Sequence, residues 1–234
     1  MPYLRGMNPT RKSITYSSDP DRVPFRQNPF LWLLSALFLL FWGYGWWGNH
    51  NMENWIIENL LVIIFLGILA GTYRRFRFSD LSYLFFFVYL LLHVYGAFYA
   101  YTDNAFGAWL QQHYHLQRNP YDRIVHFSFG LLVAYPAREL LINRFRVPLS
   151  RAYFYAAELM FSLGTLFEMV EWAVAECTDP LTGDTYVATQ GDIWDAHKDI
   201  ILALLGASIA MSLLYLVERR RKARLQQLPA AGRS

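Results

Sequence analysis

Seven acidic and histidine side chains recur at helical spacing in three stretches of the sequence, "YDRIVHF", "FEMVEW" and "QGDIWDAHKDI". They are Asp122, His126, Glu168, Glu171, Asp192, Asp195 and Asp199. Spacings of three and four residues place side chains on one face of a helix, and the three aspartates also share a face if their helix begins by Asp192. One imidazole with several carboxylates is a ligand set suited to Zn²⁺, Mn²⁺, Fe²⁺ or Mg²⁺.

The charge of these stretches favours a bound cation. Six of the seven side chains are carboxylates, and only Arg123 and Lys198 lie beside them in the three stretches, which leaves a formal excess of four negative charges. Crowded carboxylates that are partly removed from water repel one another, so they must share protons or a cation. We therefore predict a divalent metal ion at this place. Its expected ligands are Asp122, His126, Glu168, Asp192 and Asp195.

Helix capping is the competing interpretation of these acids. Asp192 is suited to cap the last apolar helix, and Asp122 to begin the helix that contains it, because carboxylates stabilise the positive end of a helix dipole. Glu168 and Glu171 instead lie at the far end of their apolar stretch, where acids are unfavourable. Carboxylates in that position need a partner, which favours a functional site over capping.

The elements that must position these groups are membrane helices. The chain has 234 residues, of which 55% are hydrophobic and 17% charged, so it is more apolar than an ordinary soluble domain. Six stretches approach the ~20 apolar residues that cross a bilayer. They run over Phe30–Trp47, Asn54–Tyr73, Leu81–Tyr101, Ile124–Ile142, Ala152–Ala175 and Trp194–Val217. We therefore predict an all-α polytopic membrane protein, a bundle of about six transmembrane helices.

Basic residues divide the chain and orient it. We expect a polar cytoplasmic segment over residues 1–29, a six-helix transmembrane domain over 30–217 and a basic cytoplasmic tail over 218–234. Lys and Arg are concentrated in the two terminal segments and in the second and fourth connections between apolar stretches, and such loops stay in the cytoplasm. Both termini are therefore predicted to be cytoplasmic, which places the seven side chains near the outer face of a bacterial inner membrane. We interpret the net charge of +3 as a signal of orientation in the membrane rather than of nucleic-acid binding, and no nucleic-acid-binding module is visible.

Several other residues have simpler interpretations. Cys177 is the single cysteine, so the chain alone builds neither a disulfide nor a thiolate metal site. Gly67 and Gly71 form a GxxxG pair that could let a neighbouring helix approach closely. His93 is interpreted as a buried, hydrogen-bonded histidine rather than a ligand, and Glu58 as an acid that could reach the site. The stretch "DPLTGDTYVATQ" is interpreted as a turn-rich outer loop.

The ordered combination of "YDRIVHF", "FEMVEW" and "QGDIWDAHKDI" resembles the YjdF-like family of uncharacterised bacterial inner-membrane proteins over most of the chain. The same order of motifs is distantly similar to VanZ-like proteins, which are associated with glycopeptide tolerance. Trp194 and Lys198 depart from the residues expected in VanZ-like chains. The resemblance implies the topology and the motif residues, and it implies no particular reaction.

The leading functional hypothesis is a metal-dependent hydrolase or transferase that acts on a lipid or lipid-linked head group at the outer face. In this scheme a metal-activated water attacks the substrate, Glu171 or Asp199 acts as general base, and Arg123 and Lys198 hold an anionic phosphate. A proton- or cation-coupled transporter is one alternative, in which the acids act without chemistry. The other is a non-catalytic membrane scaffold with a structural charge network. The expected partners are the lipid bilayer and a lipid-linked substrate, and no nucleic acid.

Overall fold

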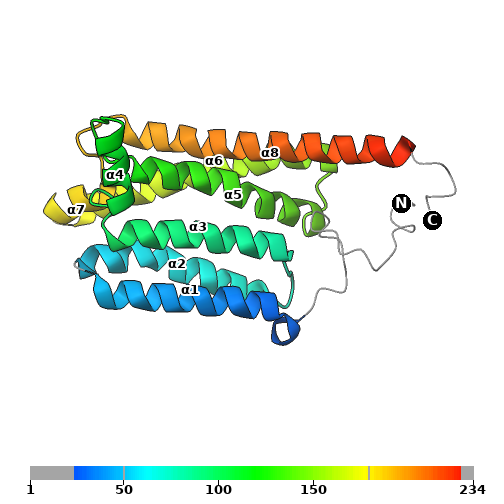
Figure 1. Ribbon diagram of the computed structural model, residues 1–234, viewed down its shortest axis with the longest axis horizontal. Helices are drawn as coiled ribbons and strands as arrows, with labels where there is room; N and C mark the ends of the chain where they lie inside the picture. The colour runs from blue at the N-terminus through cyan, green and yellow to red at the C-terminus, as the bar shows by residue number, and fades with distance from the viewer. Residues whose placement is uncertain (1–23, 50, 179, 228–234) are drawn as a thin grey trace.

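The computed structural model describes residues 24–49, 51–178 and 180–227, and within them the regular elements are all helices (Figure 1). They are a 3-10 helix over Phe25–Gln27, α1 (Pro29–Gly48), α2 (Met52–Thr72), α3 (Asp80–Phe98), α4 (Ala105–His113), α5 (Tyr121–Asn143), α6 (Leu149–Cys177), α7 (Pro180–Val187) and α8 (Asp195–Gln227). The predicted all-α class is confirmed. Most of the polar N-terminal segment and the last residues of the basic tail lie outside the described residues.

The six long helices form two groups that meet along one seam. α5, α6 and α8 pack on one another, α1 and α2 each pack on α3, and contacts between α3 and α5 join the groups. The short helices α4 and α7 lie together at one end of the bundle, which we call the α4/α7 end (Figure 1). α1 begins and α8 ends at the opposite end, which we call the terminal end. This arrangement is the one that an even number of membrane crossings requires, while the side on which each end lies stays a prediction.

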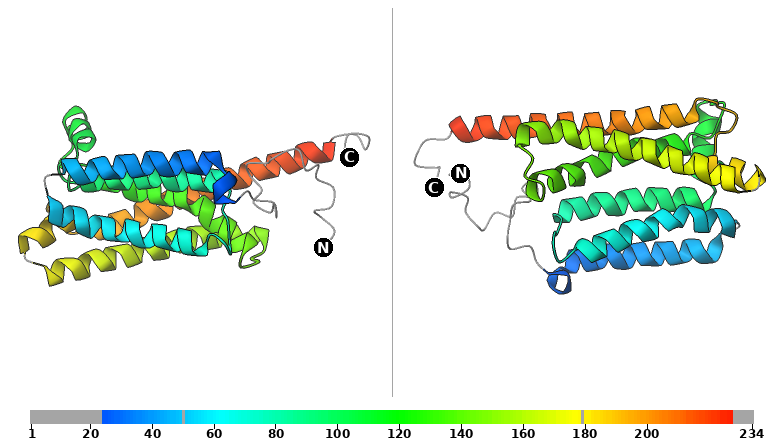
Figure 2. Two further views of the ribbon diagram at one scale, coloured as in Figure 1. Left: turned by 90° about the horizontal axis from the view of Figure 1, so that it is seen from below. Right: turned by 180° about the vertical axis from the view of Figure 1, so that it is seen from behind.

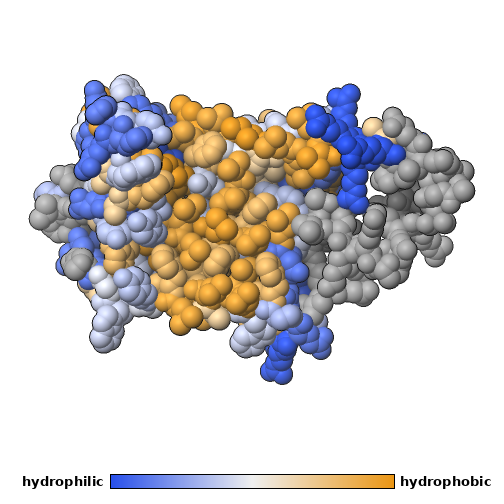
Figure 3. All heavy atoms as spheres, in the orientation of Figure 1, coloured by the Kyte–Doolittle hydropathy of each residue, from blue (hydrophilic) through white to orange (hydrophobic). Residues whose placement is uncertain are grey.

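Five of the six expected spans are long and apolar enough to cross a membrane, namely α1, α2, α3, α5 and α8, counted over the described part of the chain. α6 is longer than any of them except α8, with 29 residues, but it carries Glu158, Glu168 and Glu171 along its length. It packs beside α5 and α8 over the same part of the bundle. In Figure 3 the middle of the visible face is a broad apolar band, and polar residues lie at both ends of it.

Side-chain caps explain where several of the helices begin. Asn28 directly precedes Pro29, the first residue of α1, and its side chain accepts a hydrogen bond from the Leu31 amide. Asn51 and Ser79 cap α2 and α3 in the same way. Such caps satisfy amide groups that no helical carbonyl can reach, which matters most near a bilayer that offers no water. The sequence stretch expected to be a turn-rich loop contains the helix α7, so that interpretation is wrong for residues 180–187.

Glycine does control a close helix contact, although at other positions than expected. A methyl group added at Gly130 of α5 would collide with the Ala203 carbonyl oxygen of α8, and one added at Gly206 would collide with the Phe127 carbonyl oxygen. The backbones of α5 and α8 therefore approach too closely for any side chain to lie between them. At Gly67 and Gly71, no described atom lies within 4 Å of an added methyl group. That face of α2 points outward, so the possible GxxxG contact is not made with another described helix of this chain.

A second set of charged residues, not anticipated from the sequence, is buried at the terminal end. The Arg138 guanidinium lies 3.0 Å from the Glu218 carboxylate, which also accepts a 2.6 Å hydrogen bond from the Tyr153 hydroxyl. Glu139, one residue further along α5, accepts hydrogen bonds from the Ser79 amide and hydroxyl at the start of α3. These contacts tie α5 to α8, α6 and α3. α8 itself continues to Gln227, so the helix extends well into the segment expected to be a separate tail.

Candidate metal centre and the adjoining cavity

The acidic side chains are brought together by the starts of α5 and α8 and the last third of α6. The loops before α5 and α8 are joined by two hydrogen bonds, from the Asn119 amide to Gln190 Oε1 at 2.9 Å and from Gln190 Nε2 to the Asn119 carbonyl at 3.1 Å. Together with the glycine contact of α5 and α8, these bonds fix the register of the two helices. Asp122 and His126 of α5 therefore face Asp199 of α8, within the first two turns of the two helices.

Three side chains converge closely enough to hold one metal ion. Asp122, His126 and Asp199 are all buried, and each offers a ligand atom within 4.8 Å of those of the other two. His126 Nε2 lies 3.5 Å from Asp122 Oδ1 and 3.4 Å from Glu168 Oε1. Asp199 Oδ1 is buried and accepts no hydrogen bond from the described residues. A buried carboxylate oxygen without a donor is costly unless a cation or proton satisfies it, so this donor set fits a divalent ion.

Asp192 and Asp195, two of the expected ligands, instead lie in ion pairs. Asp192 Oδ2 is 2.5 Å from both Arg123 Nη2 and Lys198 Nζ. Asp195 pairs with the Arg118 guanidinium and lies 3.3 Å from Arg123 Nη2. α8 begins at Asp195, so Asp192 precedes the helix and the shared face assumed for the three aspartates does not form. We remove both residues from the expected ligand set, because cationic side chains already neutralise them.

The same ion pairs change the interpretation of Arg123 and Lys198. Both were expected to hold an anionic phosphate, and both are instead occupied by Asp192, outside the cavity described below. Arg118 is the cation that sequence reasoning missed. It lies four residues before Asp122, at 3.8 Å from that carboxylate, and it also donates to the Ala188 carbonyl. The i, i+4 spacing to Asp122 is the sequence signal that could have found it.

The Asp192 ion pairs predict a specific acid dependence of stability. The hydrogen bond from Lys198, followed by those from the Trp194 amide and Arg123, lowers the pKa of Asp192 to about 2. A carboxylate with a lowered folded-state pKa contributes stability above its unfolded-state pKa of about 4, and loses it as the pH falls toward 2. We expect the melting temperature of wild type to exceed that of Asp192→Asn at pH 5, and the difference to shrink toward zero as the pH is lowered to about 2.

Thermal unfolding of detergent-purified protein across this pH range checks the prediction. Asp103→Asn is the matched control, since Asp103 is exposed in the turn after α3 and should show no such pH-dependent difference. A gap between wild type and Asp192→Asn that stays constant with pH would show that the two ion pairs contribute nothing to folding.

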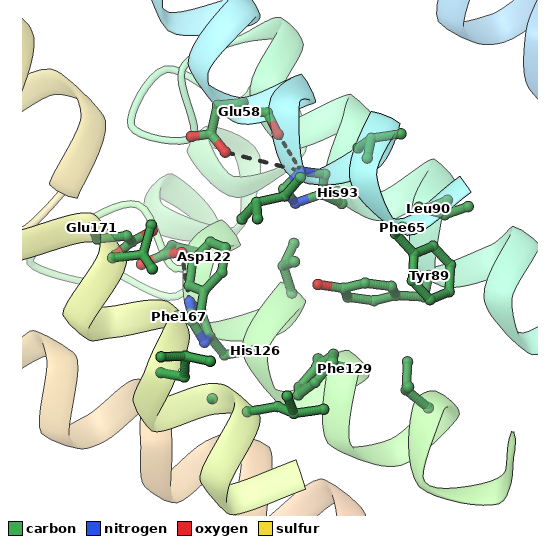
Figure 4. A pocket seen from close by; sticks show the side chains of 18 of the residues that line it. Glu58, Phe65, Tyr89, Leu90, His93, Asp122, His126, Phe129, Phe167 and Glu171 are labelled. Atoms are coloured by element: carbon green, nitrogen blue, oxygen red, sulfur yellow. Dashed lines mark hydrogen bonds and ion pairs between the residues drawn. The ribbon is translucent and has the colours of Figure 1, made fainter. Parts of the chain in front are cut away.

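Three acids and two histidines line one end of a cavity of about 430 Å³ between α2, α3, α5 and α6, namely Glu58, Asp122, Glu171, His93 and His126. Figure 4 shows Glu58 and His93 on one side of it and Asp122, His126 and Glu171 on the other. His93 Nδ1 lies 2.7 Å from the Tyr101 hydroxyl, and Nε2 lies 3.2 Å from the Glu58 carbonyl oxygen. The interpretation of His93 as a buried, hydrogen-bonded histidine is thereby confirmed.

The rest of the cavity wall is apolar and opens sideways. α2 and α6 run on the same side of the molecule (Figure 2, left) without packing closely on each other, and both contribute lining residues. The exposed members of that lining are aliphatic on both helices. They are Ile64 and Ile68 of α2 and Leu163, Leu166 and Val170 of α6. Because α2 is an apolar helix of membrane-spanning length and these exposed side chains are aliphatic, we infer that the opening faces the hydrocarbon of the bilayer rather than water.

Comparison with known proteins identifies the family. Residues 30–220 match the family model described as "Predicted membrane protein (DUF2238)". The chain belongs to this family. It is also 32% identical over 176 residues to "Inner membrane protein YjdF" of Escherichia coli (strain K12), an alignment that covers 75% of this chain and 82% of that protein. No solved structure matches.

The DUF2238 match covers α2, α3, α5 and α6, nearly all of α1, α8 as far as Arg220, and every residue of the candidate metal centre. The expected YjdF-like resemblance is therefore confirmed, while the distant VanZ-like similarity stays a prediction. With five helices that can cross a membrane and an inner-membrane relative, the chain is a multi-pass inner-membrane protein.

Proposed function

We propose that this DUF2238 protein is a metal-dependent hydrolase or transferase that acts on a lipid or lipid-linked head group. The observation that carries the proposal is that Asp122 and His126, two members of the Asp122, His126 and Asp199 cluster, line a cavity that opens sideways into the bilayer. A bilayer lipid can enter such an opening without leaving the membrane. Its apolar chain then lies along the α2 and α6 side chains, and its head group reaches the acids.

The chain's own residues suit the chemistry of such a site. Asp122, His126 and Asp199 would hold a Zn²⁺, Mn²⁺, Fe²⁺ or Mg²⁺ ion. Glu168, also expected as a ligand, lies beside this set, with its Oε1 3.4 Å from His126 Nε2. A divalent ion there supplies Lewis-acid polarisation of a phosphoryl or carbonyl group and makes water easier to deprotonate. Glu171 is buried, lines the cavity, and is the candidate for a general base. Asp199 was expected to be a general base. We assign it to the ligand set instead, because its carboxylate lies close to His126.

Metal content tests the proposal directly. Detergent-purified wild type should carry about one divalent ion per chain, measured by plasma mass spectrometry, and Asp199→Asn should lower that content about tenfold or more. Asp192→Asn is the matched control, because it makes the same change near the same helix start at a carboxylate that is already ion-paired. It should retain the metal. The metal site would be refuted if wild type held no stoichiometric metal and its melting temperature did not change on addition of chelator, Zn²⁺ or Mn²⁺.

A proton- or cation-coupled transporter is the second candidate, and the buried charges at the terminal end are the observation in its favour. Transport requires polar groups that continue between the two ends. Between α5, α6 and α8, the layer between the ends is instead an apolar core that includes the buried side chains Ala134, Met160 and Ala207. We therefore rank transport below lipid chemistry. Cation flux into proteoliposomes that is lost in Glu168→Gln would reverse that ranking.

A further inference from the structure

A second cavity, of about 510 Å³, lies at the terminal end between α1, α2 and α3. It is separate from the candidate metal centre, and only Leu90 lines both. α1 and α2 meet near the α4/α7 end, where Trp42 Nε1 donates a 2.6 Å hydrogen bond to Asn59 Oδ1. Toward the terminal end the two helices diverge, and the floor of the resulting groove is formed by the buried side chains Tyr83 and Phe86 of α3.

The length of the groove matches one leaflet of a bilayer. Along α2 its lining runs from Leu66 to Arg74, which corresponds to about 12 Å of helix. Half of a typical hydrocarbon core is about 15 Å thick. The groove therefore begins at the membrane surface of the terminal end and stops near the middle of the bilayer. A hydrocarbon chain from a single lipid fills such a space, whereas a membrane-spanning helix would extend far beyond it.

The mouth of the groove carries a positive charge. Arg74 is exposed, and it is the one charged side chain among the described residues that line the groove. Beside it, the Tyr73 ring packs edge-on against Phe25 and lies under the Arg77 guanidinium, at 6.1 Å and 5.5 Å. An arginine and a tyrosine at the level of the head groups, above an apolar groove, complement an anionic head group joined to an acyl chain.

We propose that the groove between α1, α2 and α3 is a binding site for an anionic glycerophospholipid of the leaflet at the terminal end. One acyl chain lies against the α3 floor, and Arg74 binds the phosphodiester. The site does not depend on the proposed metal chemistry, because none of the candidate metal ligands lines it. It gives the protein a lipid preference at the end of the bundle opposite the candidate active site.

Native mass spectrometry of the full chain in detergent tests the proposal, with phosphatidylglycerol and phosphatidylcholine of identical acyl chains as probes. A single arginine at an anionic membrane surface corresponds to about a fivefold preference for phosphatidylglycerol. Arg74→Gln should reduce phosphatidylglycerol binding to the phosphatidylcholine level. Ala70→Trp, which places an indole into the groove, should reduce the binding of both lipids.

Two matched variants of the same segment separate the site from general effects. Arg75→Gln removes the same charge from an exposed position outside the groove, and Gly71→Trp adds the same ring where no described atom lies within 4 Å. Both should bind the two lipids as wild type does. Equal losses in Arg74→Gln and Arg75→Gln, unchanged binding in Ala70→Trp, or a dimer in place of lipid adducts would each overturn the proposal.

Discussion

Gly206→Leu is expected to disrupt the bundle, whereas Gly67→Leu should leave it intact. At Gly206 the new side chain meets the Phe127 carbonyl oxygen, and backbone atoms cannot move aside as a flexible side chain can. α5 and α8 would have to separate along the close contact between them, which also positions Asp122 and Asp199. Overpacking of this kind costs about 3 kcal/mol or more, which corresponds to a loss of about 10 °C in melting temperature for a chain of this size.

Thermal unfolding in detergent, followed by helical circular dichroism, measures both variants. Gly67 is a matched control because it is also a glycine within a membrane helix, it is exposed, and neither cavity includes it. Its change to leucine adds apolar surface toward lipid and should shift the melting temperature little. Similar shifts for the two variants would mean that α5 and α8 do not approach as closely as described.

Arg138→Met is expected to cause a loss of similar size at the terminal end. The change leaves the Glu218 carboxylate buried, where it still accepts a hydrogen bond from the Tyr153 hydroxyl. Removing one partner of a buried ion pair costs about 3–5 kcal/mol, because the other charge stays out of water without compensation. The Arg138 guanidinium also lies 4.3 Å above the Tyr153 ring, so packing is lost together with charge.

The double variant Arg138→Met/Glu218→Leu distinguishes this mechanism from simple loss of packing. Replacing both charges by apolar side chains removes the uncompensated carboxylate, so stability should recover most of the way to wild type. Arg219→Met provides the matched single change, since Arg219 is exposed and adjacent to Glu218 in sequence. A double variant that is less stable than Arg138→Met would show that Glu218 does not need its cationic partner.

Local sequence information was sufficient for the helices, for a physical reason. Inside a bilayer the backbone must satisfy its own hydrogen bonds, so a long apolar stretch has little choice but to form a helix. The expected spans therefore agree with α1, α2, α3, α5, α6 and α8 to within a few residues at most ends. The spacing of Asp122 and His126 likewise determined that they share one face of α5, because both lie on the same rigid helix.

What the sequence could not determine is how each helix is rotated and where it begins relative to its neighbours. Asp192 and Asp199 have the spacing of one helical face, yet α8 starts only at Asp195. Arginines from another part of the chain neutralise Asp192 and Asp195. The pairing of Arg138 with Glu218 joins residues 80 positions apart. Such pairs depend on side-chain packing between helices, for which Gly130 and Gly206 set the distance. The sequence alone thus determined the helices and the kinds of side chain available. Only the tertiary structure decided which carboxylates are ion-paired and which could hold an ion, because ion pairing is a contact between helices rather than a property of one helix.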